Sequence, residues 1–294
     1  MFLTDQKRWR IASHAVMILL STLALMPFVL LIISSFTDER VALINGYSFW
    51  PEKLSLDAYR YILDNREVFF RAYGITFLVT AIGVPANVSI TSLTGYVLSK
   101  RKLPGVKILN FMVIFTMLFN GGLVATYVSY VTIFGIKDTL FALLVPSLLM
   151  SSFMVMLVRN YFEHSIPGEI YESARMDGAN EFLIFFRLVL PLSTPILATV
   201  GLMMGIAYWN DWQNSLYYID DRSLYSIQAV LNAINESIAV LASLAEASGV
   251  SAAELPTSTI RMAVATVGIL PILITYPFFQ KYFAKGLMAG SIKG

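Results

Sequence analysis

The chain has 294 residues, 57% of them hydrophobic and only 14% charged, with a net charge of +2 and a mean hydropathy of +0.68. Soluble globular domains carry about 25% charged residues, so this composition excludes an ordinary soluble domain and favours a polytopic membrane protein. The sequence has no cysteine, which excludes disulfides, thiolate metal sites and a cysteine nucleophile, and its two histidines, His14 and His164, are far apart. We therefore expect no metal site, no catalytic residue and no cofactor bound by this chain.

Six apolar runs free of acidic residues, lysine and arginine approach the roughly 20 residues that cross a bilayer. In lipid every backbone polar group needs an internal partner, so each run is predicted to be a helix. The third run is longer than needed and contains Gly121 and Gly122, so tilting or a break at the glycines would absorb the excess. The predicted fold is all-α, a single transmembrane domain over residues 1–294 whose six spans are residues 11–36, 72–98, 108–136, 139–158, 188–210 and 262–280.

Lysine and arginine gather on one side of the predicted membrane. With six spans, the N-terminus, the 99–107 loop, the 159–187 loop and the tail share one side, with thirteen basic and six acidic residues. The opposite side holds eight basic and thirteen acidic residues. The positive-inside rule therefore predicts that both termini and the 159–187 loop face the cytoplasm.

Two long segments, residues 37–71 and 211–261, fall on the outer side. Such loops either bind a partner or cover helix ends, and the sequence leaves both interpretations open. Val230–Val250 is an alternative seventh span, but it contains Glu236 and Glu246 and would carry the basic tail outside, so an amphipathic external helix is favoured. The first run is too long for a cleaved signal peptide, and no small-x-small cleavage site follows it.

A polar segment, residues 167–187, interrupts the apolar runs and predicts two short helices. Pro167 suits a first helical position, and Glu169 then meets the positive end of the helix dipole. Asp177 and Gly178 are expected to end this helix, with glycine in the left-handed conformation. Asn180 is expected to cap a second helix.

The 167–187 segment has the features of a lever that a soluble partner grips. Ser173 and Ala174 are small enough for close approach, and Glu172 and Asp177 offer carboxylates to basic groups. Aromatic residues at helical spacing would anchor the segment to the feet of the spans: Phe182, Phe185 and Phe186. The alternative is an interfacial helix lying on headgroups, but such helices favour basic residues, whereas acidic residues outnumber basic ones here.

Residues Glu172-Ser173-Ala174, then Gly178, then Leu188-Val189-Leu190-Pro191 resemble the EAA motif of ABC importer permeases. Ser173 replaces the usual first alanine, and Leu188 the usual isoleucine. Trp209-Asn210-Asp211 and the proline pair Pro191 and Pro195 resemble the carbohydrate-importer branch, and the six-span layout resembles the smaller permease subunit of maltose-type transporters. Residues 119–123, Phe-Asn-Gly-Gly-Leu, resemble a subgroup that handles complex or acidic oligosaccharides such as alginate.

The resemblance implies a bacterial inner-membrane protein, multi-pass, that carries oligosaccharides with three kinds of partner. These are a second permease, expected as a heterodimer, two ATPase subunits that use ATP and Mg, and an extracytoplasmic solute-binding protein. The chain has no G-x-x-x-x-G-K-[ST] loop, so nucleotide must be bound by a separate chain. Carried over by residue, the ATPase contact would be Glu172, Ser173, Ala174, Asp177 and Gly178.

The sugar path is expected to use aromatic faces and amide groups inside or at the ends of spans. The same Trp and Tyr residues would also suit an aromatic belt at the membrane surface, and Asn120 would also suit a helix kink. The candidates are Asn120, Tyr127, Tyr130, Tyr208, Trp209, Asn210 and Trp212.

Other functions stay open at this point. A permease for a non-sugar solute fits the same motif. A secondary carrier usually buries acidic or basic groups in the membrane, and the six runs contain no Asp, Glu, Lys or Arg. No Ser/His/Asp or paired-carboxylate set lies within the runs, which argues against an intramembrane enzyme, and thinly spread basic residues argue against nucleic-acid binding.

Overall fold

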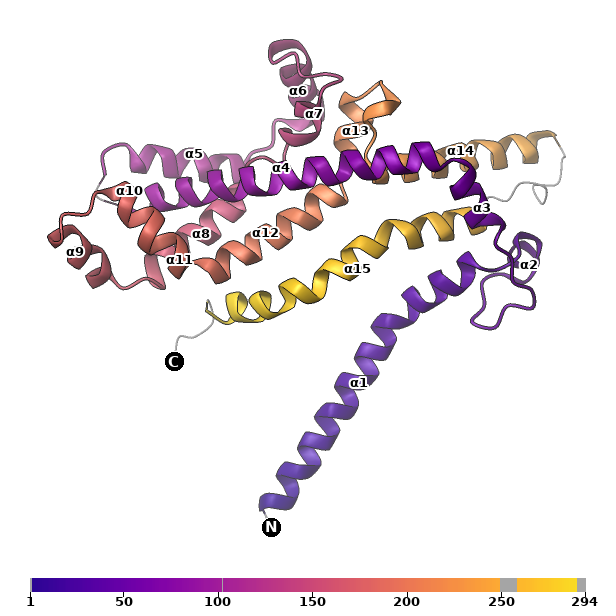
Figure 1. Ribbon diagram of the computed structural model, residues 1–294, viewed down its shortest axis with the longest axis horizontal. Helices are drawn as coiled ribbons and strands as arrows, with labels where there is room; N and C mark the ends of the chain where they lie inside the picture. The colour runs from indigo at the N-terminus through magenta and orange to yellow at the C-terminus, as the bar shows by residue number, and fades with distance from the viewer. Residues whose placement is uncertain (1, 102, 249–257, 290–294) are drawn as a thin grey trace. The chain divides into compact units, whose positions relative to one another are not determined.

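The computed structural model describes residues 2–101, 103–248 and 258–289, which form helices joined by short connections (Figure 1). In these residues the one β pairing is an isolated bridge between Thr37 and Leu54, so the all-α prediction is confirmed. The chain divides into two compact units. The first comprises Met1–Phe69 and Leu231–Leu270, and the second comprises Phe70–Val230 and Pro271–Gly294.

The first unit contains α1 (Phe2–Ser35), α2 (Glu39–Asn45) and α3 (Asp57–Asp64), with parts of three longer helices. Its connections are fixed by polar contacts distant in sequence. The Glu39 carboxylate accepts the backbone N–H groups of Ser258 and Thr259, both at 2.8 Å, and so caps the start of α15. The Phe36 and Tyr59 rings stack at 4.7 Å, which holds α3 against the end of α1.

The second unit is a bundle around α8, which packs against α5 and α12. Glycine allows α4 to approach its neighbours closely, because a Cβ on Gly83 would lie 2.4 Å from the Tyr208 ring. The long helices α4 (Arg66–Ser99), α14 (Ile227–Ser248) and α15 (Ser258–Ala289) run through both units. The remaining helices are α5 (Val106–Leu118), α6 (Gly122–Val128), η1 (Ser129–Ile133), α7 (Leu140–Leu144), α8 (Ser152–His164), α9 (Gly168–Met176), α10 (Glu181–Ile184), η2 (Phe185–Val189), α11 (Leu190–Leu192), α12 (Thr194–Trp209), α13 (Gln213–Tyr218) and η3 (Arg222–Leu224).

Three stretches of the described residues are long and apolar enough to cross a membrane as single helices: Trp9–Ser35, Arg66–Ser99 and Ser258–Thr275. A fourth is a bent pair, Glu181–Leu192 and Thr194–Trp209, whose two parts meet at 77°, so the prediction of one continuous helix over 188–210 is wrong. The break falls at Ser193, and Pro195, which cannot donate a backbone hydrogen bond, stands in the first turn after it. The run at 108–136 breaks between Leu118 and Gly122, as its glycines predict, and Gly122 has a φ of +82°. The α14 helix confirms helical structure after residue 227, and Val230–Val250 continues beyond it into residues outside the described ranges.

The prediction of one continuous helix over 139–158 is wrong. Here α7 ends at Leu144 and α8 begins at Ser152, and Ser147 between them has a φ of +62°. Proline in a helix interior removes one backbone hydrogen bond and clashes with the preceding turn, and Pro146 stands at this point. We call residues 145–151 the helix break.

Side chains from three other helices satisfy the carbonyls that the helix break frees. The Asn87 amide donates to the Leu148 and Leu149 oxygens, at 2.8 and 3.1 Å. The Tyr208 hydroxyl donates to the Leu144 oxygen at 2.9 Å, and the Asn214 amide donates to the Pro146 oxygen at 3.1 Å. Non-helical backbone is tolerated at membrane depth where protein groups pair with it, and this break meets that condition.

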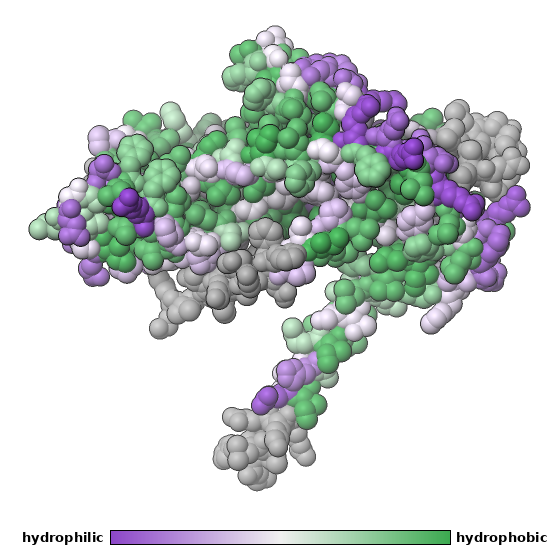
Figure 2. All heavy atoms as spheres, in the orientation of Figure 1, coloured by the Kyte–Doolittle hydropathy of each residue, from purple (hydrophilic) through white to green (hydrophobic). Residues whose placement is uncertain are grey.

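Polar side chains concentrate at two places on the visible face of the second unit. Hydrophilic residues gather around α9 and around α13 and η3, while hydrophobic residues cover the helices between them (Figure 2). A bundle with apolar flanks and polar ends is the pattern that a bilayer requires.

Candidate functional site

The 167–187 segment forms two short helices joined by a tight turn. The first, α9, starts at Gly168 with Pro167 at the N-cap, one residue later than predicted. Gly178 has a φ of +81°, and its N–H donates to the Arg175 oxygen while that of Ala179 donates to the Ala174 oxygen. This pair of bonds is a Schellman motif, which ends the helix as the sequence predicts. The Asn180 side chain accepts the Leu183 N–H at 2.8 Å and caps α10, also as predicted.

The five residues predicted to contact an ATPase lie along α9 and the turn that follows it. Glu172, Ser173, Asp177 and Gly178 are exposed, whereas Ala174 is buried in the core of the second unit. The segment therefore presents two carboxylates beside a small serine side chain on its outer face. Ala174 packs α9 against the core and does not face outward.

The prediction that three phenylalanines share one anchoring face is wrong. Phe185 is 3% exposed and packs on the Tyr96 ring at 5.0 Å. Phe182 and Phe186 are 74% and 56% exposed. Phe182 and Phe186 are one helical turn apart and stay on the exposed side, whereas Phe185 points to the other side and packs on Tyr96.

A cavity of about 360 Å³ and another of about 440 Å³ lie in the second unit, and the larger of these two adjoins α9. Charged side chains line the larger one, and sequence reasoning did not connect them. The Glu181 carboxylate accepts the Tyr96 hydroxyl at 2.5 Å and the Arg175 guanidinium at 2.8 and 3.0 Å. The Lys100 ammonium lies 3.5 Å above the centre of the Tyr171 ring.

These contacts alter the titration of the groups around the cavity. Burial lowers the pKa of Lys100 to about 8, since the loss of water disfavours the charged ammonium, although the nearby Glu181 opposes the shift. Burial raises the pKa of Glu181, but hydrogen bonds from Tyr96 and Arg175 outweigh it and leave the pKa below its usual value. Glu181 is therefore ionised at neutral pH.

A second charged pair braces the same region from the side of α8. Glu163 pairs with Arg101, and its other oxygen lies 3.6 Å from the Arg159 guanidinium. Arg159 also donates to the Asn110 side chain at 3.0 Å, which ties α8 to α5. The connection after α4 and the helix α8 are thus joined by an ion pair, and a hydrogen bond joins α8 to α5.

The seven sugar-path candidates do not converge on one cavity. Asn120 accepts the Gly122 N–H and stabilises the turn between α5 and α6. Tyr127 and Tyr130 pack against the Tyr218 ring at 5.8 and 6.0 Å. Tyr208 is 2% exposed, and its hydroxyl supports the helix break, so this geometry gives it a packing role.

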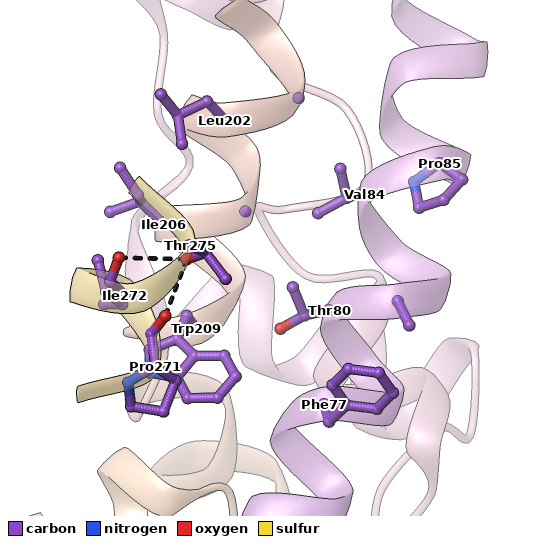
Figure 3. A pocket seen from close by; sticks show the side chains of 13 residues that line it. Phe77, Thr80, Val84, Pro85, Leu202, Ile206, Trp209, Pro271, Ile272 and Thr275 are labelled. Carbon is purple, nitrogen blue, oxygen red and sulfur yellow. Dashed lines mark hydrogen bonds between the residues drawn. The ribbon is translucent and has the colours of Figure 1, made fainter. Parts of the chain in front are cut away.

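The other three candidates surround the end of α12. The Trp209 ring lines the cavity of about 360 Å³ between α4, α12 and α15 (Figure 3). The Thr275 hydroxyl in that cavity already donates to the Pro271 and Ile272 oxygens, and almost every other lining group is apolar, which does not suit a sugar. Asn210 accepts the Gln228 amide at 3.2 Å, and Trp212 is partly exposed.

Asp211, which follows Asn210, is a titratable group that the sequence analysis did not single out as a site. Burial raises its pKa to about 6, and hydrogen bonds from the backbone N–H groups of Asn214 and Gln213 oppose this shift. Within the described ranges no three His, Asp or Glu side chains come close enough to hold a metal ion. The polar groups that the structure places in this region form ion pairs and hydrogen bonds.

Comparison with known proteins points to one family. Residues 76–288 match the family described as "Binding-protein-dependent transport system inner membrane component". The chain is 36% identical over 282 residues to the polygalacturonan/rhamnogalacturonan transport system permease protein YtcP of Bacillus subtilis (strain 168), covering 96% of both chains. It is 35% identical over 274 residues to the protein LplC of the same strain, covering 92% of this chain and 90% of LplC.

A solved structure is similar over nearly the whole chain. It is a crystal structure of a bacterial ABC transporter involved in the import of the acidic polysaccharide alginate. The TM-score is 0.78 with 27% sequence identity, and the match covers 95% of this chain and 98% of the other.

Proposed function

This chain belongs to the family of binding-protein-dependent transport system inner membrane components, and from that premise we propose that it is one permease half of an importer for acidic oligosaccharides. As a family member it is a non-catalytic, multi-pass membrane subunit of an ABC transporter, and the ATPase is a separate chain. The secondary-carrier alternative is therefore wrong.

The proposed substrate class rests on the agreement between a sequence comparison and a structural comparison. YtcP is named for polygalacturonan and rhamnogalacturonan, and the structural match imports alginate. Both groups of polymers contain uronic acids, whose carboxylates distinguish them from neutral sugars. The match to each covers more than nine-tenths of this chain, which supports a substrate of the same chemical class.

We propose that α9 receives the motion of the ATPase. Glu172 and Asp177 are the exposed carboxylates for basic groups of that subunit, Ser173 permits close approach, Gly178 forms the turn and Ala174 seats the helix. Two ATPase subunits, a second and different permease, and an extracytoplasmic binding protein complete the assembly. In this proposal both termini and α9 face the cytoplasm of a bacterial cell.

For the sugar path, the candidates best placed are Tyr127, Tyr130 and Trp212. Tyr127 and Tyr130 retain partial exposure beside Tyr218, and Trp212 follows α12 outside the apolar cavity. Aromatic faces of this kind suit the apolar side of a sugar ring. Asn210 and Trp209 contribute from the end of α12, and Asn120 contributes from the turn between α5 and α6.

The test is sugar-stimulated ATP turnover by the assembled importer in lipid nanodiscs. The complex contains this chain, its partner permease, the ATPase and the binding protein. Oligogalacturonate and oligoalginate are expected to raise ATP turnover several-fold, whereas a neutral malto-oligosaccharide of equal length is not. Stimulation by an amino acid or a phosphate ester, with none by any sugar, would overturn the proposal.

A further inference from the structure

We propose that Glu181 is a positioning residue that locks α9 to the foot of α4, through a clamp of Tyr96, Lys100, Tyr171, Arg175 and Glu181. The inference rests on the proposed role of α9 as the receiver of ATPase motion. It assigns a second route for that motion, directly into α4 through side chains. The other route follows the chain from α9 through α10 and α11 into α12.

Glu181 is the centre of the clamp because its two oxygens serve different helices. One oxygen accepts the Tyr96 hydroxyl of α4 at 2.5 Å, and the other accepts Nε and Nη2 of Arg175 on α9 at 3.0 and 2.8 Å. The two-nitrogen contact fixes the orientation of the guanidinium as well as its distance. One carboxylate at the start of α10 thereby joins three helices.

Burial shows which of these bonds anchors the clamp. The Arg175 and Glu181 side chains are 48% and 52% exposed, and exposed ion pairs contribute little on their own. Tyr96 is buried and packs against the Phe162 and Phe185 rings at 6.4 and 5.0 Å. The Tyr96 hydroxyl is therefore the fixed end of the clamp. Glu181 binds it with one oxygen and, with the other, fixes the position of the more exposed Arg175.

Lys100 forms the second half of the clamp. Its ammonium lies 3.5 Å from the centre of the Tyr171 ring on α9 and 4.7 Å from that of Tyr96 on α4. A cation above an aromatic ring is attracted by the electrons of the ring face, and the attraction strengthens where water is excluded. Lys100 thus connects the same two helices as Glu181 does, by a different interaction.

The cavity beside the clamp explains why these contacts matter. It occupies about 440 Å³, and Lys100, Tyr171, Arg175 and Glu181 are among its lining residues. The cavity lies along one side of α9 while Ala174 packs on the core, so the bridging side chains add to that packing where the cavity lies. The chain itself provides no short link, since Tyr96 and Glu181 are 85 residues apart.

Functional coupling provides the first test, in the complete importer in nanodiscs. Tyr96→Phe removes only the hydroxyl, and Glu181→Gln removes only the charge. Each is expected to lower sugar uptake per ATP hydrolysed about tenfold, the order expected for losing a charge-assisted hydrogen bond, while assembly and basal ATP turnover are retained. The double variant should be no worse than the more severe single variant, because both break one link.

Glu169→Gln is the matched control, because it removes an exposed carboxylate from the same helix and should behave as wild type. Additive losses in the double variant, or single variants equal to this control, would overturn the clamp. If the wild-type complex shows no sugar-stimulated turnover, the proposed function fails instead. The failure of the proposed function can be distinguished from the failure of the clamp, because a second test measures the clamp without any substrate.

The second test measures the position of α9 in this chain reconstituted in lipid. The sequence has no cysteine, so Leu93→Cys on α4 and Met176→Cys on α9, both exposed, accept a spin-label pair. The clamp predicts one narrow distance distribution, which Tyr96→Phe and Glu181→Gln broaden and Glu169→Gln leaves narrow. An unchanged distribution in all variants would show that α9 is held by other contacts.

Discussion

The helix break at 145–151 and the α9–α10 segment both interrupt the bundle of the second unit, but different chemistry holds each in place. The break is fixed by the neutral side chains of Asn87, Tyr208 and Asn214, all buried and all bonded to backbone oxygens. The polar contacts of the α9 segment instead use charged side chains that remain half exposed, beside the buried Ala174 and Phe185. Neutral buried bonds suit a fixed joint, since breaking one strands a desolvated carbonyl. Long charged side chains at a wet surface can re-pair as a segment moves.

The largest expected effect comes from Asn87→Leu, which would break the fixed joint. Asn87 is 0% exposed and donates to two carbonyls, while its oxygen accepts the Thr91 hydroxyl at 3.2 Å. Leucine leaves those groups without their partner, at a cost of about 2–4 kcal/mol. Thermal unfolding of the detergent-purified chain should begin at a markedly lower temperature. A variant as stable as wild type would show that the joint does not depend on Asn87.

Glu172→Lys should abolish uptake while leaving the fold intact. Glu172 is exposed on α9, so charge reversal costs little in stability but opposes a basic ATPase surface. Uptake should fall more than about tenfold, as one lost charged contact at an interface would cause, with insertion and ATP hydrolysis retained. Parallel assays of uptake and phosphate release measure this. Normal uptake would contradict the assignment of α9 as the ATPase contact.

Substitutions of Lys100 test whether positive charge holds α9 in place. A cation above an aromatic ring should tolerate replacement by another cation. Lys100→Arg keeps the cation over Tyr171 and should retain most of the coupling between ATP turnover and uptake. Lys100→Gln removes the cation and should reduce the coupling between ATP turnover and uptake about threefold, in line with ~0.5–1 kcal/mol for a cation–π contact near the surface. Equal behaviour of the two variants would mean that the side chain acts through its length alone.

The smallest effect concerns Asp211, an acidic group that supports the fixed joint. Asp211 accepts the N–H of Asn214, which itself bonds to Pro146, and burial raises the pKa of Asp211 to about 6. The folded state therefore binds a proton more tightly than the unfolded state, so stability should fall as pH rises from about 4 to 6. Melting curves across this range should show that Asp211→Asn lacks this dependence. The same slope in both proteins would assign it to another group.

The sequence predicts those features of the fold that depend on residues close to one another in the chain. The end of α9 at Gly178, the cap at Asn180 and the break near Gly121 all depend on residues within one or two turns. Pro146 marks a candidate break at 145–151, but Pro85 lies inside the continuous helix α4, so a proline alone does not decide. The partner Asn87, which pairs with the freed carbonyls, lies 61 residues from Leu148. The error over Phe182 and Phe186 has a related cause, since helical spacing places the three rings near one another but only packing against Tyr96 decides which of them is buried. Tyr96 and Glu181 likewise meet only after the bundle forms.

The carboxylate of Glu39 has a consequence for biosynthesis. It closes the start of α15 by accepting N–H groups from Ser258 and Thr259, and 219 residues of chain separate it from the first of these. At ribosomal speeds of roughly 5–20 residues per second, the acid emerges on the order of tens of seconds before the helix that it caps. The α15 helix therefore finds its capping group already made, and Glu39 waits for these partners until Ser258 and Thr259 have been synthesised.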